Sequence, residues 1–300
     1  MPESEFPHFL ALREREGGPR VYKDLIVHLD GTEEDTIRLA QAESIARRFE
    51  AHLTGLYTNP LPEYAYVMAI QSQLAPMGPI LAFDQEIRKQ GDVVVGRLKE
   101  RFEKIPVASD IRRIDAGVSI LPRLCASAAR WSDLFVATAP YRGEASPGWE
   151  ALVETVLFES GQALFLVPQQ YRASGTIRNI LVAWRDTRES ARALAEAMPL
   201  LRAATNVRLV MVDSLGEDEE HEDPLVVTAH LRCHGAKAEL RSIEAKGRSV
   251  SEVLLGEAGK MAADLIVMGA YGHSRLREWM LGGTTREVVA RAEVPILLAH

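Results

Sequence analysis

Residues that could bind a phosphate are concentrated near the carboxyl end of the chain. An apolar run over residues 264–268 leads into glycines and hydroxyl residues, which are Gly269, Gly272, Gly282, Gly283, Thr284 and Thr285. A strand that ends in glycines and feeds a helix presents unpaired backbone N–H groups at the positive end of the helix dipole. Glycine also lets the main chain approach an anion closely. The segment therefore predicts a cradle for a nucleotide phosphate. The alternative is an ordinary turn in which a threonine caps the helix.

Polar residues inside the same glycine segment could contribute to the cradle. His273 and Ser274 follow Gly272 directly, in the loop over the predicted phosphates. His273 either contacts the anion or lies exposed to solvent. Arg275 and Arg277 add positive charge nearby, and the alternative for both is a solvated position or a pair with the neighbouring Glu278.

Composition and charge exclude several classes of protein. The 300 residues are 47% hydrophobic and 26% charged, which is typical of a soluble globular protein. A formal net charge of −7 without a dense block of Lys and Arg argues against nucleic acid as a partner. Residues 1–20 are too charged for a signal peptide, and no apolar run is long enough to span a membrane. We expect a cytoplasmic protein that binds neither nucleic acid nor membrane.

The two halves of the chain repeat one pattern. Apolar runs open both halves and recur near their ends, at residues 25–30 and 180–185 and at residues 133–139 and 264–270. Amphipathic helical patterns lie between such runs, which indicates a parallel sheet covered on both faces. The predicted fold class is therefore α/β, with two doubly wound parallel-sheet domains in tandem. The predicted boundaries are a tail over 1–20, a first domain over 21–170 and a second domain over 176–300.

One segment has no counterpart of equal length in the other half. Residues 59–84 are rich in proline and large apolar residues, and we expect an insertion that packs over the sheet edge or covers a cleft as a lid. Helices are predicted to begin after it at Gln85 and Leu121. The two cysteines, Cys125 and Cys233, fall in helical patterns, one in each half, so reduced thiols are expected.

This arrangement resembles the universal stress protein family in its tandem form. Members of that family that bind ATP have a glycine, two residues, a glycine, nine residues, and then a glycine followed by Ser or Thr. Gly269, Gly272 and Gly282 fall at this spacing, but Gly283 follows, so the hydroxyl is displaced to Thr284. Backbone N–H groups carry much of phosphate binding, so this departure weakens the match without abolishing it.

The resemblance further implies an aspartate on the ribose side, at the end of the first strand of a domain. Asp30 stands there in the first half, whereas Arg185 stands there in the second. The first half lacks the phosphate glycines, and Pro140 in their place has no N–H to donate. We expect a degenerate first site that retains Asp30. The second site keeps the cradle, with adenine near Trp184 and Val212, although Trp184 could equally fill core volume.

The resemblance also implies a function and an assembly. We expect a stress-response protein that binds an adenine nucleotide such as ATP, with Mg²⁺ as a candidate companion ion, or another phosphate ligand. A partner protein, not identified by the sequence, would read the bound state. The last strands of the two domains, Ala163–Pro168 and Pro295–Leu298, should meet as an intramolecular pseudo-dimer, and a homodimer of whole chains is a further expectation.

The sequence lacks three catalytic or cofactor-binding motifs that were considered. Gly272–Leu276 lacks the second glycine of a nucleophile elbow, Gly259–Lys260 lacks the hydroxyl residue of a phosphate loop, and the first strand-to-helix turns lack a dinucleotide fingerprint. No catalytic residue is assigned, and at most a slow, incidental ATP hydrolysis is expected. Two alternatives stay open. One is a scaffold without nucleotide, in which Arg185 closes the site, and the other is a small-ligand or metal sensor using residues 59–84 or the pair His230 and His234.

Overall fold

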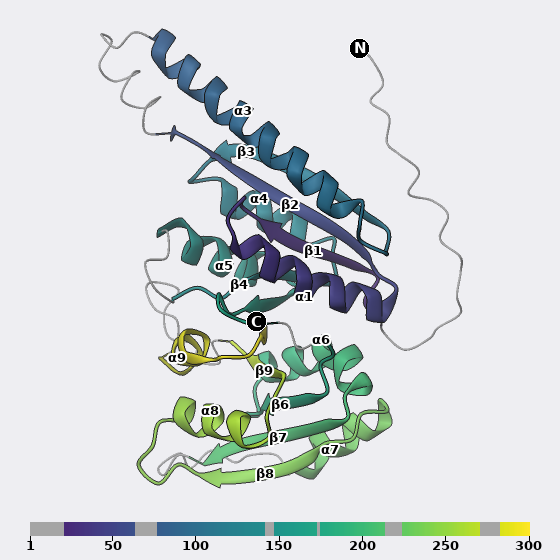
Figure 1. Cartoon of the computed structure of the whole chain (residues 1–300). Coiled ribbons are helices and arrows are strands. Elements are labelled where there is room, and N and C mark those ends of the chain that lie inside the picture. Colours follow the sequence, from purple (N-terminus) through teal and green to yellow (C-terminus); the bar gives the residue numbers. More distant parts are fainter. Residues whose placement is uncertain (1–20, 64–76, 142–146, 173–174, 214–223, 271–282) are drawn as a thin grey trace.

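The computed structural model describes residues 21–63, 77–141, 147–172, 175–213, 224–270 and 283–300 (Figure 1). The strands of the first half are β1 (Asp24–Leu29), β2 (His52–Leu61), β3 (Ser109–Gly117), β4 (Leu134–Thr138) and β5 (Ala163–Val167). Those of the second half are β6 (Asn179–Ala183), β7 (Asn206–Asp213), β8 (Glu239–Glu244), β9 (Leu265–Gly269) and β10 (Ile296–Ala299).

These strands form a single 10-stranded sheet in the order β3-β2-β1-β4-β5-β10-β9-β6-β7-β8. Strands β5 and β10 pair antiparallel at its centre, with Leu166 opposite Ile296 and Leu164 opposite Leu298. The other neighbouring strands of the described chain pair in parallel. The predicted fold class is confirmed, and so is the predicted meeting of the last strands of the two halves. Both strands are buried along their length, and pairing them covers two apolar edges that would otherwise face water.

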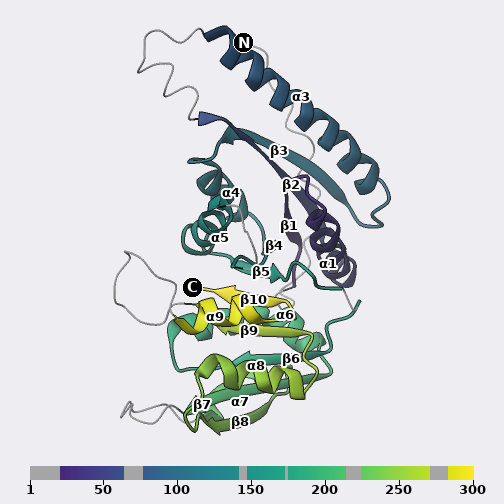
Figure 2. The ribbon, with the colours of Figure 1, turned by 60° about the vertical axis from the view of Figure 1, so that its left-hand side comes forward.

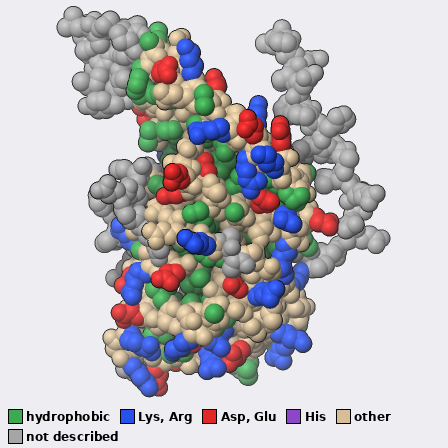
Figure 3. Space-filling view, viewed as in Figure 1, with side chains coloured by type: hydrophobic (Ala, Val, Ile, Leu, Met, Phe, Trp, Pro, Cys, Tyr) green, Lys and Arg blue, Asp and Glu red, His purple; other side chains and the backbone are tan. Residues whose placement is uncertain are grey.

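Helices cover both faces of this sheet (Figure 2). The helices are α1 (Glu34–Phe49), α3 (Met77–Phe102), α4 (Leu121–Ala129), α5 (Pro147–Glu159), α6 (Arg188–Ala203), α7 (Pro224–Cys233), α8 (Val250–Lys260) and α9 (Gly283–Arg291). Helices α1, α3, α6 and α7 share one apolar cluster, and α4, α5, α8 and α9 share the other. No described helix is both long and apolar enough to cross a bilayer. On the face seen in Figure 3, acidic and basic side chains are interspersed.

The predicted insertion over residues 59–84 is shorter in the structure. Asn59 to Leu61 continue β2, because they pair with Asp115 to Gly117 of the edge strand β3. Helix α3 begins at Met77, eight residues before its predicted start at Gln85. Its third residue is Pro79, and a proline in the first turn of a helix needs no N–H donor. The rest of the predicted insertion, residues 64–76, lies outside the described part of the chain.

The same hydrogen-bond pattern occurs in both halves and shows which of their residues correspond. Asp133 Oδ2 accepts the backbone N–H groups of Lys23 and Asp24, at 2.6 and 3.0 Å. Asp264 Oδ2 does the same for Arg178 and Asn179, at 2.9 Å each. Counting onward from these matched residues, the position of Asp30 after β1 corresponds to that of Arg185 after β6. This correspondence between the halves, based on the hydrogen bonds of Asp133 and Asp264, agrees with the sequence repeat.

Candidate functional site

At the carboxyl end of β1, a buried cation occupies the first half's candidate site. Arg38 lies on α1 with only 1% of its surface exposed. Its Nη2 donates to Asp30 Oδ1 at 2.6 Å and makes a short contact with Asp35 Oδ1. Asp35 precedes Arg38 by one helical turn, so one helix brings both side chains to the turn that follows β1. Arg38 is therefore neutralised by the first half's own carboxylates.

Aromatic side chains complete this cluster from two other elements. The Arg38 guanidinium lies over the Trp149 ring, 5.2 Å from its centroid, and the fully buried His28 ring lies 4.6 Å from the same ring. Trp149 Nε1 donates to the backbone oxygen of Thr138 at 3.1 Å. His28 Nε2 lies 2.8 Å from the Thr58 hydroxyl. Strands β1, β2 and β4 and helices α1 and α5 thus converge on one charged and aromatic core.

Burial and charge shift the titration of these groups. Burial, together with the neighbouring Arg38, lowers the pKa of His28 to about 3, so the imidazole is neutral. Burial alone would raise the pKa of Asp30, but the Arg38 charge and the Thr32 hydrogen bond hold it well below its usual range. Burial outweighs the attraction of Arg38 at Asp35, and with the negative charge of Asp30 it raises the pKa of Asp35 to about 6.

The turn between β1 and α1 is itself an anion site that the protein fills internally. The Asp35 carboxylate accepts the backbone N–H groups of Asp30 and Gly31, at 3.1 and 2.8 Å. Gly31 has a φ of +84°, a conformation that glycine adopts without strain and that turns its N–H toward the carboxylate. The turn that could receive a ligand anion is therefore occupied by a side chain.

Sequence analysis identified Asp30 but missed Arg38, Asp35 and His28. The signal lay in the helical period, because Asp35, Arg38, Ala42 and Ile45 share the buried stripe of α1. A charged pair on an otherwise apolar stripe indicates an internal ion pair.

The second half has small side chains at the positions of this cluster. The buried positions of α6 repeat those of α1, so that Ala193 corresponds to Arg38 and Ser190 to Asp35. The same register places Ala183 of β6 at the position of His28. Two methyl groups thus replace the buried guanidinium and imidazole, and the second half carries no equivalent internal ion pair among these positions.

Gly269 brings the end of β9 against the start of α6. A Cβ atom on Gly269 would lie 2.5 Å from Ser190 N and 2.6 Å from Glu189 C, which are backbone atoms. Helix α6 begins beside it, with Thr187 as N-cap accepting the Ser190 N–H at 3.3 Å. Only glycine permits this approach, so the residue predicted for phosphate contact has a packing role as well.

The structure places the remaining predicted site residues at several points. Helix α9 begins at Gly283, Thr284 is half-buried and Thr285 is 5% exposed. Gly272, His273, Ser274 and Gly282 lie outside the described residues. Arg185 is half-buried after β6, and its backbone oxygen accepts the Thr187 N–H at 2.8 Å.

The two residues predicted to contact adenine lie on opposite faces of the sheet. Trp184 packs against the apolar cluster that includes α6, whereas Val212 packs against the cluster that includes α8. The structure therefore does not bring them together.

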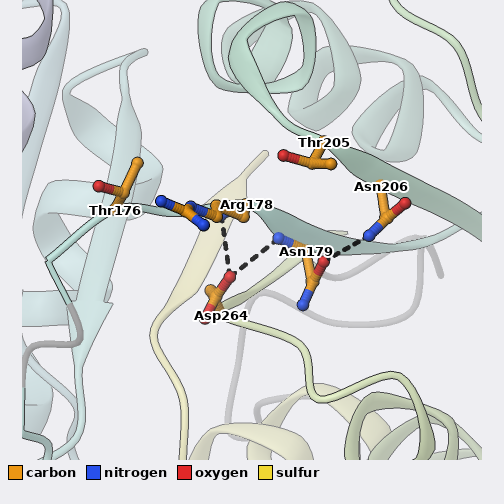
Figure 4. Close-up of a pocket in the computed structure, with 6 residues that line it drawn as sticks. All are labelled: Thr176, Arg178, Asn179, Thr205, Asn206 and Asp264. Carbon is orange, nitrogen blue, oxygen red and sulfur yellow. Dashed lines mark hydrogen bonds between the residues drawn. The ribbon is translucent and has the colours of Figure 1, made fainter.

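A polar hollow of about 580 Å³ lies at the other end of β6, β7 and β9. Its lining residues are Thr176, Arg178, Asn179, Thr205, Asn206 and Asp264 (Figure 4). Asp264 is held by two backbone N–H groups, and Asn206 Nδ2 donates to Asn179 Oδ1 at 2.8 Å. Asp133 makes the same backbone contacts in the first half, so Asp264 has a structural role that both halves share.

The histidine pair considered for a metal is exposed at the end of α7, with His230 in the helix and His234 just after it. The rings of His230 and His234 lie 4.5 Å apart between centroids. Within the described ranges, no group of three or more candidate metal ligands occurs. Among the residues that the structure describes, the pair therefore has no third protein ligand of the kind that a zinc site usually has.

Comparison with known proteins adds a family assignment for the second half. Residues 176–300 match the Universal stress protein family, so this part of the chain is a universal stress protein domain. A universal stress protein of Synechocystis sp. is 47% identical over 36 residues, a match that spans 12% of this chain and 12% of that protein.

Solved structures extend the likeness to nearly the whole fold. A universal stress protein from Archaeoglobus fulgidus DSM 4304 has a TM-score of 0.68 at 13% identity, over 92% of this chain and 95% of that one. A functionally unknown protein from Pseudomonas aeruginosa PAO1 has a TM-score of 0.54 at 15% identity, over 93% of this chain and 92% of that one. At these identities the likeness establishes the shared fold.

Proposed function

We propose that this chain is a tandem universal stress protein in which the second domain binds an adenine nucleotide and the first does not. One observation carries the proposal. Arg38 and His28 fill the first site, where Arg38 pairs with Asp30 and Asp35, whereas Ala193 and Ala183 stand at the equivalent positions of the second. The second domain therefore lacks the side chains that close the first.

The geometry of β9 and α9 supports the same assignment. In open α/β sheets, ligands bind outside the carboxyl ends of the strands, where the strand order reverses. That point lies between β9 and β6 here, since β10-β9 run one way from it and β6-β7-β8 the other. Gly269 ends β9, and α9 begins at Gly283 with an N-terminus suited to phosphate. ATP, carrying its own Mg²⁺, is the ligand we propose for this point.

The proposed role is ligand-dependent binding, not chemistry. A partner protein in the cytoplasm would read the nucleotide-bound state during a stress response. In this proposal backbone N–H groups hold the phosphates. The protein partner and a homodimer of whole chains remain part of the proposal.

Titration with ATP by calorimetry tests the proposal. We expect saturable binding of about one ATP per chain. A separate aliquot is heat-denatured, and the absorbance of its supernatant shows whether an adenine compound copurifies. Ala193→Arg should abolish binding because its long side chain would fill the volume that Arg38 fills in the first site, and Gly272→Glu should abolish it by placing a carboxylate in the glycine segment. Ala191→Arg, at an exposed position of the same helix, is the matched control and should bind like the wild type.

Two results would count against nucleotide binding. Absence of binding by the wild type at millimolar ATP would favour the scaffold alternative. Equal binding by wild type and by a folded Ala193→Arg protein would place the ligand elsewhere. Circular dichroism spectra of all variants establish that they are folded.

A further inference from the structure

The turn after β6 differs in charge from its counterpart after β1. Residues 30–38 hold four acidic side chains and one basic side chain, whereas residues 185–193 hold two acidic and three basic side chains. Two positions change from an acid to an arginine, with Arg185 in the place of Asp30 and Arg188 in the place of Glu33. The first turn is acidic, and the second has a net positive charge.

The internal anion of the first turn is also absent from the second. Asp35 supplies the carboxylate that binds two backbone N–H groups of the first turn. Its counterpart Ser190 is neutral, and its hydroxyl accepts a hydrogen bond from Thr187 at 3.2 Å. An anion that the first half provides from its own sequence therefore has no side-chain counterpart at position 190.

The remaining acids of the second turn do not replace that carboxylate. Glu189 is buried and receives a hydrogen bond from Arg188 Nε at 2.5 Å. Burial opposes ionisation of Glu189, but its hydrogen bonds to Arg188 and to backbone lower its pKa. Glu189 is therefore ionised at neutral pH and already paired with Arg188. Asp186 is exposed to solvent.

The sheet order indicates which part of a nucleotide would reach this turn. Strands β9 and β6 are direct neighbours, with Met268 opposite Ala183, and neighbouring strands lie about 4.8 Å apart. A nucleotide whose 5′-phosphate lies at the end of β9 has its ribose as the next group, over the end of β6. Arg185 follows that end by two residues.

Resting on the proposed function, we infer that the second domain prefers adenine nucleotides that carry a phosphate on the ribose as well as at the 5′ position. An acidic residue beside a ribose accepts its hydroxyl groups, whereas an arginine at such a point accommodates a phosphate on the 2′ oxygen. Arginine can pair with phosphate through two parallel hydrogen bonds. Arg185 is then the residue that selects the ligand, and the acid-rich turn of the first half would repel the same compound.

Calorimetric titrations with three nucleotides test this inference. The probes are adenosine 5′-monophosphate, adenosine 2′,5′-bisphosphate and adenosine 3′,5′-bisphosphate. We expect one bisphosphate to bind the wild type about tenfold more tightly than the monophosphate, the gain from one added charge-assisted contact. Arg185→Asp should reverse this preference and Arg185→Gln should remove it. Arg188→Gln is the control for Arg185→Gln, with the same loss of charge on an 82% exposed side chain of the same turn and an amide that can still donate to Glu189, and it should keep the preference.

The outcomes separate this inference from the proposed function. If ATP and the monophosphate bind but neither bisphosphate binds more tightly, the ribose-phosphate preference is wrong and the nucleotide site stands. If a folded Arg185→Asp protein keeps the preference, or Arg188→Gln loses it as Arg185→Gln does, Arg185 is not the selecting residue. If ATP and all three probes fail to bind, both proposals fall together.

Discussion

Replacing Arg38 with methionine should strongly destabilise the first half. Methionine keeps most of the apolar stem but removes a guanidinium that is 1% exposed and held by Asp30 and Asp35. Breaking a buried ion pair from one side costs about 3–5 kcal/mol, because the remaining charge has no partner. Here two carboxylates are left, so we expect a loss of about 4 kcal/mol in the free energy of unfolding at pH 7.5.

The penalty should shrink as the pH falls. In the wild type the pKa of Asp35 is raised to about 6, so its contribution to stability is full below the unfolded value near 4 and is lost as the pH rises through 6. Without Arg38, the two neighbouring carboxylates Asp30 and Asp35 should bind their first proton at a higher pH than in the wild type. Each pH unit of that difference is worth about 1.4 kcal/mol, so the penalty should fall by about 1–2 kcal/mol between pH 7.5 and pH 5.

Urea unfolding followed by circular dichroism measures this change, with hydrogen exchange of the α1 and β1 amides reporting on the first half alone. Adding Asp30→Asn and Asp35→Asn to Arg38→Met should recover more than half of the loss, since no buried charge is then unpaired. Arg47→Met, at an exposed position of α1, is the control and should cost less than about 0.5 kcal/mol. A loss below about 1 kcal/mol for Arg38→Met, or one that is equal at both pH values, would refute the reasoning.

Three further predictions concern packing, capping and thiol reactivity. Gly269→Ala should lower the melting temperature by several degrees, because its Cβ would lie 2.5 Å from the backbone of α6. The control is Gly256→Ala in α8, whose Cβ would meet nothing within 4 Å and which should be neutral or stabilising. Equal melting temperatures for the two variants would contradict the close approach at Gly269. Ser249→Ala removes the capping box of α8 and should cost about 1 kcal/mol in urea unfolding, and no change would show that the cap is dispensable. Burial raises the pKa of Cys125 to about 12, so a thiol reagent at pH 8 should modify Cys233 alone until the protein is unfolded, and rapid modification of both would contradict that burial.

The sequence repeat was enough to predict the architecture but not the contents of the first site. The strands could be predicted from apolar runs and helical periods, because a buried strand is a short run of apolar residues. The pairing of β5 with β10 at the centre of the sheet was predicted from the family resemblance. The start of α3 at Met77 was missed because proline was interpreted as a loop residue. Arg38 was missed because an isolated arginine in a helix is usually solvated, and only the fold shows that its neighbours are buried acids. For the second site, the predicted phosphate residues Gly272, His273, Ser274 and Gly282 lie outside the described residues.

The antiparallel junction of β5 and β10 limits how copies of the chain can associate. The last strands of the two halves pair with each other, so neither strand is available to pair with a second copy of the chain. The strands left at the two ends of the sheet are β3 and β8. Both display charges of either sign toward water, such as Asp110 and Arg112 on one and Glu239 and Arg241 on the other. Charged edge strands discourage strand-by-strand growth into fibres, so the two ends of this sheet disfavour association of copies through added strands.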